Sequence, residues 1–173
     1  DVDEYTSAII IGAVGVVPGV LASLAVDRIG RRILLLVSEV LMVLAHASLG
    51  AFFNVKESRP DVAEDQLGWL PLVALVVFII GYSMGLGPIT YTVVPEILPQ
   101  RVRGLVSSIV TSLRWGLAFL VTRFFYNLLS ALGDDGGYWF FGGICLLGFF
   151  YIFFFIPETK GKTLEEIQLL FIK

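Results

Sequence analysis

Charged residues gather in three short segments, each directly beside a long apolar stretch. The segments are 27–32, 95–104 and 157–162, and together they contain both carboxylates and arginines. Because a guanidinium binds a carboxylate through two rigid donors, arginine fixes the geometry of such pairs better than lysine does. We therefore predict a group of ion pairs where the apolar stretches end. Its members, here called the charge cluster, are Asp27, Arg28, Arg31, Arg32, Glu96, Arg103 and Glu158.

A second candidate site lies in the apolar stretch 69–94, which contains several residues that interrupt helices. Gly81, Gly85, Gly87 and Pro88 follow one another closely there. Proline removes a backbone donor, and glycine lets the chain bend. Within a membrane, a broken helix is tolerated where it is buried or lines a cavity, and it points to binding sites in transporters. Close helix packing at the glycines is the competing explanation.

The elements that must position these residues are expected to be membrane-spanning helices. The chain has 173 residues, of which 57% are hydrophobic, and its mean hydropathy is +0.86. Crossing the core of a bilayer takes about 20 apolar residues. Five stretches are long enough, namely 8–26, 33–53, 69–94, 105–132 and 138–156. Because core helices of a soluble protein seldom follow one another in this way, we predict an all-α membrane protein with five transmembrane helices.

The distribution of lysine and arginine predicts how these helices are oriented. On one side the loops hold Arg28, Arg31, Arg32, Arg101, Arg103, Lys160, Lys162 and Lys173, and on the other side Lys56 and Arg59. Positive residues concentrate on the cytoplasmic side of membrane proteins. We therefore expect a multi-pass protein of the plasma membrane, embedded in the lipid bilayer, with the N-terminal end of this chain outside and the C-terminal end in the cytoplasm.

Anchoring of this kind is also a simpler interpretation of the arginines in the charge cluster. It accounts for the cations, but it leaves Asp27, Glu96 and Glu158 without a reason to lie at the same depth. Partly buried ion pairs are weak evidence for stability, yet they can specify one arrangement of helices over another. We therefore favour a cluster that holds helix ends together.

The chain divides into a transmembrane bundle, residues 1–156, and a cytoplasmic tail, residues 157–173. Thr163 and Glu166 in the tail match a capping box, which predicts a short amphipathic helix; a frayed tail is the alternative. Segment 54–68 is expected to be a polar connection because it contains Pro60 and Gly68. The glycine-rich segment 133–137 is expected to form a tight turn.

Several function classes find no support in the sequence. No pairing of a nucleophile with a base, no group of metal ligands and no phosphate-binding loop is visible, so we predict no enzyme, catalytic residue, metal or cofactor. Basic patches interleaved with aromatic residues are missing, which argues against a nucleic-acid partner. The single cysteine, Cys145, lies within the last apolar stretch and is expected to be a small packing residue.

Four motifs in order resemble the C-terminal part of a sugar porter of the major facilitator superfamily. They are Asp-Arg-x-Gly-Arg-Arg at 27–32, Gly-Pro-Ile-Thr-Tyr at 87–91, a Glu-Pro-Arg-Gly pattern within 96–104, and Pro-Glu-Thr-Lys-Gly at 157–161. In the second motif, Thr90 and Tyr91 stand where the family usually has Pro and Trp. The resemblance covers nearly the whole chain. It implies that the five stretches are the eighth to twelfth helices of a twelve-helix transporter. Since the chain starts with Asp1 beside a span, we expect an excerpt whose missing partner is the N-terminal half of the same protein.

By this resemblance, the substrate is a small-molecule sugar, and the inner charges hold the helix ends together while the cavity faces outward. Sugars have polar edges and an apolar face, so a site needs hydroxyls and a flat ring. Ser83, Gly87 and Tyr91 are spaced to share one helix face. The rings and hydroxyls could instead serve packing or bond to helix carbonyls. The predicted substrate-binding residues are Ser83, Gly87, Pro88, Tyr91, Thr111, Arg114 and Trp115.

Arg114 departs from the family pattern, where an asparagine commonly reaches the sugar. An arginine near the middle of a bilayer costs about 2.5–3.5 kcal/mol on insertion scales, so it is expected to find a carboxylate or water. Glu39 is the only carboxylate within the spans, and a pair with Arg114 requires both side chains to reach toward each other. We predict that Arg114 lines the cavity and shifts substrate preference away from glucose. Arg123 is expected to reach the headgroups, and His46 to be an interior residue.

Three functions remain open from the sequence. The first is facilitated transport of a hexose or trehalose by alternating access. The second is proton-coupled sugar symport, which needs a titrating acid near the substrate, a role to which Glu39 is poorly placed. The third is a non-transporting sugar sensor or degenerate copy, which the unusual Arg114 keeps open.

Overall fold

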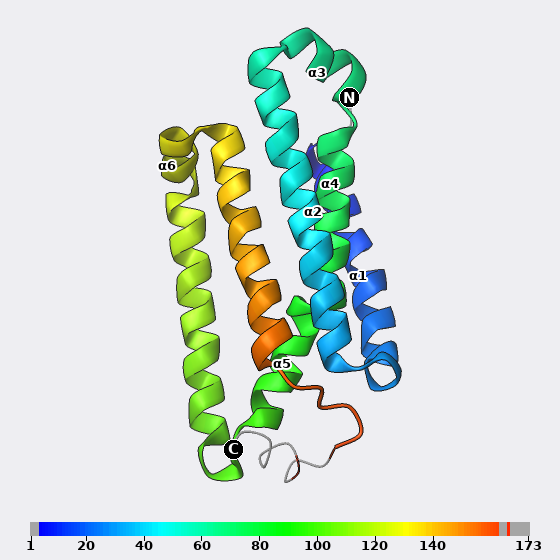
Figure 1. The fold of residues 1–173 in the computed structure, drawn as a ribbon, viewed down its shortest axis with the longest axis vertical. Helices are drawn as coiled ribbons and strands as arrows, with labels where there is room; N and C mark the ends of the chain where they lie inside the picture. Colours follow the sequence, from blue (N-terminus) through cyan, green and yellow to red (C-terminus); the bar gives the residue numbers. More distant parts are fainter. Residues whose placement is uncertain (1–3, 163–165, 167–173) are drawn as a thin grey trace.

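The computed structural model describes residues 4–162 and residue 166, and its elements are all helices within that part of the chain (Figure 1). They are α1 (Glu4–Ile29), α2 (Arg31–Ser58), α3 (Pro60–Leu67), α4 (Leu70–Met84), α5 (Leu86–Ile97) and α6 (Gln100–Phe155). The predicted all-α architecture is therefore confirmed. The amphipathic helix predicted to begin at Thr163 lies outside the described residues, apart from Glu166.

Helix α6 consists of two antiparallel legs that meet at Gly133. This glycine has φ 81° and ψ 160°, a left-handed conformation that side chains disfavour. The legs comprise residues 100–132 and 134–155, and they run side by side in opposite directions (Figure 1). Among the described residues, four helical stretches are long and apolar enough to cross a membrane: α1, α2, the α4–α5 pair and α6. The turn at Gly133 divides α6 into two legs, which correspond to the fourth and fifth predicted spans.

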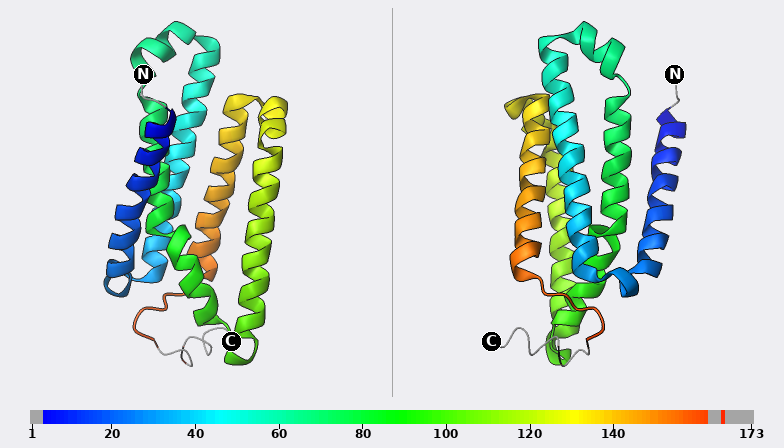
Figure 2. Two further views of the ribbon diagram at one scale, coloured as in Figure 1. Left: turned by 180° about the vertical axis from the view of Figure 1, so that it is seen from behind. Right: turned by 45° about the vertical axis from the view of Figure 1, so that its right-hand side comes forward.

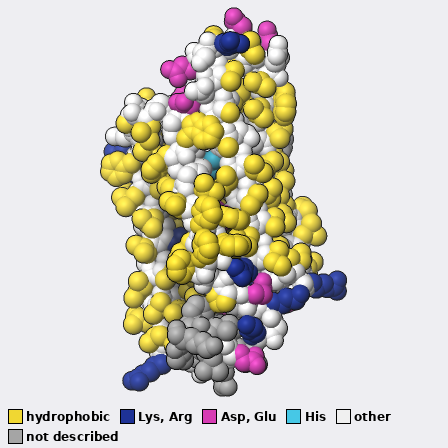
Figure 3. All heavy atoms as spheres, viewed as in Figure 1, with side chains coloured by type: hydrophobic (Ala, Val, Ile, Leu, Met, Phe, Trp, Pro, Cys, Tyr) yellow, Lys and Arg dark blue, Asp and Glu magenta, His cyan; other side chains and the backbone are white. Residues whose placement is uncertain are grey.

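Helix α2 is the central element of the bundle. It packs against α4 on one side and against the second leg of α6 on another, while α1 packs against α4 (Figure 2). Glycines bring α2 and the second leg close together: a side chain at Gly50 would meet the Trp139 ring, and one at Gly142 would meet His46. Apolar side chains cover most of the outer surface seen in Figure 3, which is the composition expected where lipid is the solvent.

The span that contains α4 and α5 is broken at Gly85, as its glycines and proline predicted. Gly85 has φ −131° and ψ −85°, far from helical values, and it separates Met84 from Leu86. The break also agrees with the packing explanation, because a Cβ at Gly85 would lie 2.3 Å from the Cβ of Ser38 in α2. The glycine therefore serves both the bend and the close approach of two helices.

Segment 54–68 was expected to be a polar connection with Pro60 and Gly68 as breakers, and in the structure most of this connection is helical. Helix α2 continues to Ser58, and α3 occupies most of the remainder. Pro60 begins α3 at a position where proline suits a helix, because its fixed φ is already helical and its missing N–H would have no partner there. The proline thus starts a short helix within the connection.

Candidate functional site

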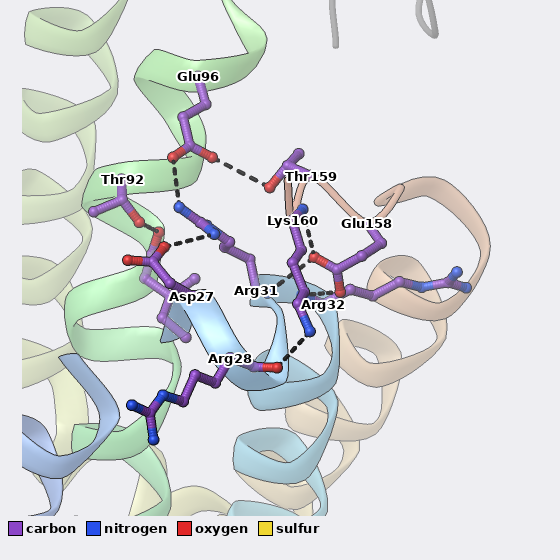
Figure 4. A network of polar contacts seen from close by, with 10 residues as sticks. Asp27, Arg28, Arg31, Arg32, Thr92, Glu96, Glu158, Thr159 and Lys160 are labelled. Atoms are coloured by element: carbon purple, nitrogen blue, oxygen red, sulfur yellow. Dashed lines mark hydrogen bonds and ion pairs between the residues drawn. The ribbon is translucent and has the colours of Figure 1, made fainter. Parts of the chain in front are cut away.

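Arg31 connects three helices at one end of the bundle (Figure 4). It is the first residue of α2, and its Nη1 lies 2.9 Å from Oδ1 of Asp27 in the last turn of α1. Its Nη2 lies 3.5 Å from Oε1 of Glu96 in the last turn of α5. The Thr159 hydroxyl, beyond α6, donates to the other oxygen of Glu96 at 3.2 Å. One guanidinium and one carboxylate therefore link the ends of α1, α2 and α5 with the segment after α6.

Glu158 binds backbone rather than arginine side chains. Its two carboxylate oxygens accept the N–H groups of Arg31 at 3.0 Å and Arg32 at 3.2 Å, which are the first amides of α2. Oε1 of Glu158 also accepts the N–H of Lys160, two residues farther along the chain, at 3.0 Å. The first amides of a helix lack partners within it and carry partial positive charge, so a carboxylate is favoured there. Sequence reasoning found Glu158 but missed this partner.

Gly30 makes room for that contact. Its φ is 105°, which favours glycine, and a Cβ on it would lie 2.6 Å from Oε2 of Glu158. The glycine between Arg28 and Arg31 is the sequence signal that could have indicated the arrangement. It gives the turn between α1 and α2 a shape that lets a carboxylate from the far end of the chain reach the start of α2.

The other three arginines of the charge cluster were expected to pair with carboxylates, and among the described residues they do not. Arg32 donates to the Phe153 carbonyl and lies over the ring of the same residue, 5.6 Å from its centre. Arg103 donates to the Leu98 carbonyl at 3.2 Å. Arg28 points its side chain away from the cluster, and only its carbonyl takes part, accepting from Lys160 (Figure 4). Backbone carbonyls at helix ends lack partners within the helix, so they compete with carboxylates for Arg32 and Arg103.

A small pocket between α5 and the first leg of α6 contains part of the predicted binding site. Its volume is about 40 Å³, and we call it the substrate pocket. Over it, the Arg114 guanidinium lies 4.6 Å from the centre of the Tyr91 ring and donates to the Tyr82 hydroxyl. Nη1 of Arg114 is buried without a hydrogen-bond partner. The lining residues are Thr90, Tyr91, Val94, Pro95, Ser107, Val110, Thr111 and Arg114.

The remaining predicted residues lie elsewhere. Ser83 and Pro88 line a groove beside α1, and Gly87 packs next to Tyr82. The expectation that Ser83, Gly87 and Tyr91 share one face required a continuous helix, and it fails because the backbone turns at Gly85. Trp115 is 67% exposed and does not line the substrate pocket.

Glu39 and Arg114 do not form the pair that the sequence left possible. Glu39 in α2 is 4% exposed, and its side chain faces the second leg of α6. A Cβ at Gly148 in that leg would be 2.6 Å from Oε1 of Glu39. Its Oε2 has no hydrogen-bond partner. Arg114 instead contacts two tyrosines of the broken span, Tyr82 and Tyr91. His46 is an interior residue, with Nδ1 2.8 Å from the Met42 carbonyl and its ring edge-on to Phe78.

The apolar helices, the broken span and the charged helix ends define a multi-pass membrane protein, and known proteins identify its family. The chain matches the sugar (and other) transporter family over residues 1–171, and it belongs to that family. This confirms the resemblance inferred from its motifs.

Similar proteins include insect transporters. The facilitated trehalose transporter Tret1 of Polypedilum vanderplanki is 46% identical over 167 residues, which are 96% of this chain and 33% of that protein. Tret1 of Anopheles gambiae is 41% identical over 96% of this chain and 21% of its own length. This chain therefore spans about a fifth to a third of the relatives that it matches.

Solved structures of the xylose transporter XylE have the same arrangement of helices. A double tryptophan mutant of XylE superposes with a TM-score of 0.83 at 27% identity, covering 96% of this chain and 34% of that one. The inward-open conformation of XylE from E. coli gives a TM-score of 0.81 at 28% identity, covering 96% and 36%. The fold is thus that of part of a major facilitator transporter, a class that one XylE structure names in its description.

Proposed function

We propose that this chain forms five helices in the C-terminal half of a longer sugar carrier, and that the carrier moves a hexose or trehalose by alternating access without coupling to protons. The observation that carries the proposal is the broken span α4–α5. Tyr91 of the substrate pocket lies after the break, and Glu96 of the charge cluster lies farther along the same helix. A change of bend at Gly85 would therefore act on both sites together.

The charge cluster supports this role because its contacts join separate segments. When the inner side is closed, the Arg31 guanidinium would hold the end of α5 against the start of α2, while Glu158 would hold the segment after α6 there. When the inner side opens, these contacts would part. Partly buried ion pairs suit this function better than apolar contacts would, since they specify one arrangement without needing to stabilise the whole fold.

The substrate pocket supplies the groups that a sugar requires. Tyr91 provides a flat ring, Thr90, Ser107 and Thr111 provide hydroxyls, and Arg114 provides donors. The pocket of about 40 Å³ is far smaller than the 300 Å³ or more of typical ligand sites. We propose that the N-terminal half completes the site, and that Trp115, which is exposed here, Ser83, Gly87 and Pro88 contribute when the halves assemble.

The experiment is uptake of radiolabelled trehalose, glucose and xylose by the full-length protein in cells without sugar carriers of their own. We expect saturable uptake of at least one of these sugars and equal accumulation on both sides of the membrane. Uptake no faster than in cells carrying an empty vector would contradict transport of these sugars.

Proton-coupled symport is the alternative, and Glu39 is the observation that favours it. Among the residues that the structure describes, no cation pairs with this buried carboxylate, and its Oε2 has no hydrogen-bond partner. It lies between α2 and the second leg of α6, whereas the substrate pocket lies between α5 and the first leg. That separation makes facilitation the better proposal. A proton gradient should leave the final level of accumulated sugar unchanged, and concentrative uptake abolished by a protonophore would establish symport instead.

The distribution of lysine and arginine supports placing the charge cluster in the cytoplasm and the carrier in the plasma membrane. A cysteine introduced at Lys162, in a Cys145→Ala background, should react with a membrane-impermeant maleimide only after the cells are permeabilised. A cysteine at Glu57, at the other end of α2, should react in intact cells. The reverse pattern would overturn the orientation.

A further inference from the structure

Ser38 occupies an unusual position in α2, next to the break between α4 and α5. Ser38 is 0% exposed. Its hydroxyl donates to the Gly81 carbonyl at 2.7 Å and accepts the Leu86 N–H at 3.3 Å. Gly81 lies before the break and Leu86 after it, so a single hydroxyl on a neighbouring helix bonds to both sides.

These two backbone groups need a partner because the helix is interrupted. In a continuous α-helix the Gly81 carbonyl would accept from residue 85, and the Leu86 N–H would donate to residue 82. The conformation of Gly85 turns the chain out of that pattern. An unpaired backbone group inside a membrane is costly, since no water is present to replace the lost bond. The Ser38 hydroxyl replaces both bonds.

Two glycines let the broken span lie close against α2 around Ser38. A Cβ on Gly85 would lie 2.3 Å from Cβ and 2.8 Å from Oγ of Ser38. A Cβ on Gly81 would lie 2.9 Å from Cβ of Leu41, also in α2. The two glycines therefore place the break directly against Ser38, and the hydroxyl cannot turn away without leaving buried polar groups behind.

Arg114 contacts the same break from the side of the substrate pocket. It donates to Tyr82 in α4 and lies over the ring of Tyr91 in α5, so it too bridges the two halves of the broken span. Ser38 and Arg114 thus hold the break from two different helices. Arg114 faces the proposed substrate, whereas Ser38 is buried away from it.

We propose that Ser38 is a positioning residue that fixes the bend at Gly85, and that sugar transport requires its two hydrogen bonds to rearrange as the bend changes. The second half of this proposal rests on the proposed function. Without the hydroxyl, the Gly81 carbonyl and the Leu86 N–H regain partners only if the span straightens. Ser38→Ala therefore favours a straighter, longer span.

The test uses the full-length protein in lipid nanodiscs, with Cys145 replaced by alanine and spin labels on cysteines at Leu72 and Val102, both exposed. Ser38→Ala should increase the population with the longer distance about 5-fold, the change that one typical hydrogen bond makes to a two-state equilibrium. Ser38→Gly, which also lacks the hydroxyl, should shift the population in the same direction. Ser48→Ala is the matched control, because Ser48 in the same helix bonds only to the Leu44 carbonyl.

Sugar uptake by the same variants separates this proposal from the proposed function. Ser38→Ala should lower the maximum rate about 5-fold and leave the half-saturation concentration within two-fold of wild type, since the residue is remote from the substrate. An unchanged distance distribution in both Ser38 variants would overturn the role of Ser38 in the bend. A shifted distribution with normal uptake would overturn its role in transport. If the wild type carries no sugar yet Ser38→Ala shifts the distances, the proposed function fails and the assignment of Ser38 to the bend stands.

Discussion

Gly30 and Glu158 depend on each other, although 128 positions separate them along the printed sequence (158 − 30). The glycine adopts a conformation that side chains rarely take, and its missing Cβ leaves space for a carboxylate that binds the first amides of α2. Neither residue explains the arrangement alone. The start of α2 has no side-chain cap of its own, so the cap comes from the segment after α6.

Replacing Gly30 with alanine should therefore destabilise the protein. The positive φ alone costs about 1–3 kcal/mol for a residue with a side chain, and the Cβ would also push Glu158 from its amides. We expect a lower melting temperature of the purified full-length protein and slower uptake. Gly104→Ala is the control, because a Cβ there meets nothing within 4 Å. Equal melting temperatures for the two variants would contradict the role assigned to Gly30.

Arg114 belongs to the same scale, because the effect on selectivity that we propose for it is that of one side chain. Among the described residues, its buried Nη1 has no hydrogen-bond partner, and we expect a bound sugar to supply one. Arg114→Asn removes the charge and the contact with the Tyr91 ring. We expect the ratio of glucose to trehalose uptake to change about 10-fold or more, since a hydrogen bond to a charged group contributes about 1.5–3 kcal/mol.

Competition between labelled glucose and unlabelled sugars would measure that change. Arg123→Asn is the control, because Arg123 stacks on Phe124 and does not line the substrate pocket. If Arg114→Asn transports the same sugars in the same ratio as the wild type, Arg114 does not set selectivity.

At the scale of elements, the broken span shows what the sequence could and could not predict. Glycines and a proline in one apolar stretch predicted the break, because their backbone properties are local. The prediction that Ser83 and Tyr91 share one helix face failed because of this break, since helical periodicity holds only within a continuous helix. The role of Ser38 could not be predicted for a different reason. A single serine in an apolar helix matches no motif, and its hydrogen-bond partners come near it only when α2 packs against α4.

The charge cluster, too, could be predicted only in part. Residue types predicted that carboxylates and arginines would meet, and Arg31 and Glu96 do. The partners of Glu158 and Arg32 could not be predicted, because they are backbone groups exposed by helix ends whose positions depend on the fold. Charge can be counted in a sequence, whereas free amides and carbonyls cannot.

Gly85→Ala should disturb the contact between α2 and the broken span. Its Cβ would fall 2.3 Å from the Cβ of Ser38, so one helix must move. Overpacking of this kind costs about 1–3 kcal/mol. We expect reduced abundance at the membrane and a lower melting temperature, both measured on the full-length protein. Gly143→Ala, where a Cβ meets nothing within 4 Å, should resemble the wild type. A Gly85→Ala protein as stable as this control would show that the two helices are not in close contact.

At the scale of the whole molecule, the charge cluster joins segments that are far apart in the sequence. The ends of α1 and α5, the start of α2 and the segment after α6 all meet around Arg31 and Glu158 (Figure 4). The substrate pocket lies farther along α5 and the first leg of α6. Because Glu96 and Tyr91 both belong to α5, we expect a movement of α5 that parts the charge cluster to change the pocket as well.

The two carboxylates that share Arg31 should contribute unequally to this connection. The Glu96 side chain is 23% exposed, whereas that of Asp27 is 78% exposed. Exposed ion pairs contribute little because water and salt screen them. Glu96→Gln removes the charge at nearly constant size, so it should favour the state in which the charged end is open. Asp27→Asn makes the same chemical change on the same cation and should have a much smaller effect.

Labelling of a cysteine at Thr111, in a Cys145→Ala background, would report that opening in membrane vesicles with the cytoplasmic face outward. Glu96→Gln should raise the labelling rate about 5-fold, as expected for the loss of one typical polar contact, and Asp27→Asn should raise it less than two-fold. Equal rates for the two variants would mean that exposure does not decide the strength of these pairs. An unchanged rate in Glu96→Gln would mean that the contact between α2 and α5 does not keep the charged end closed.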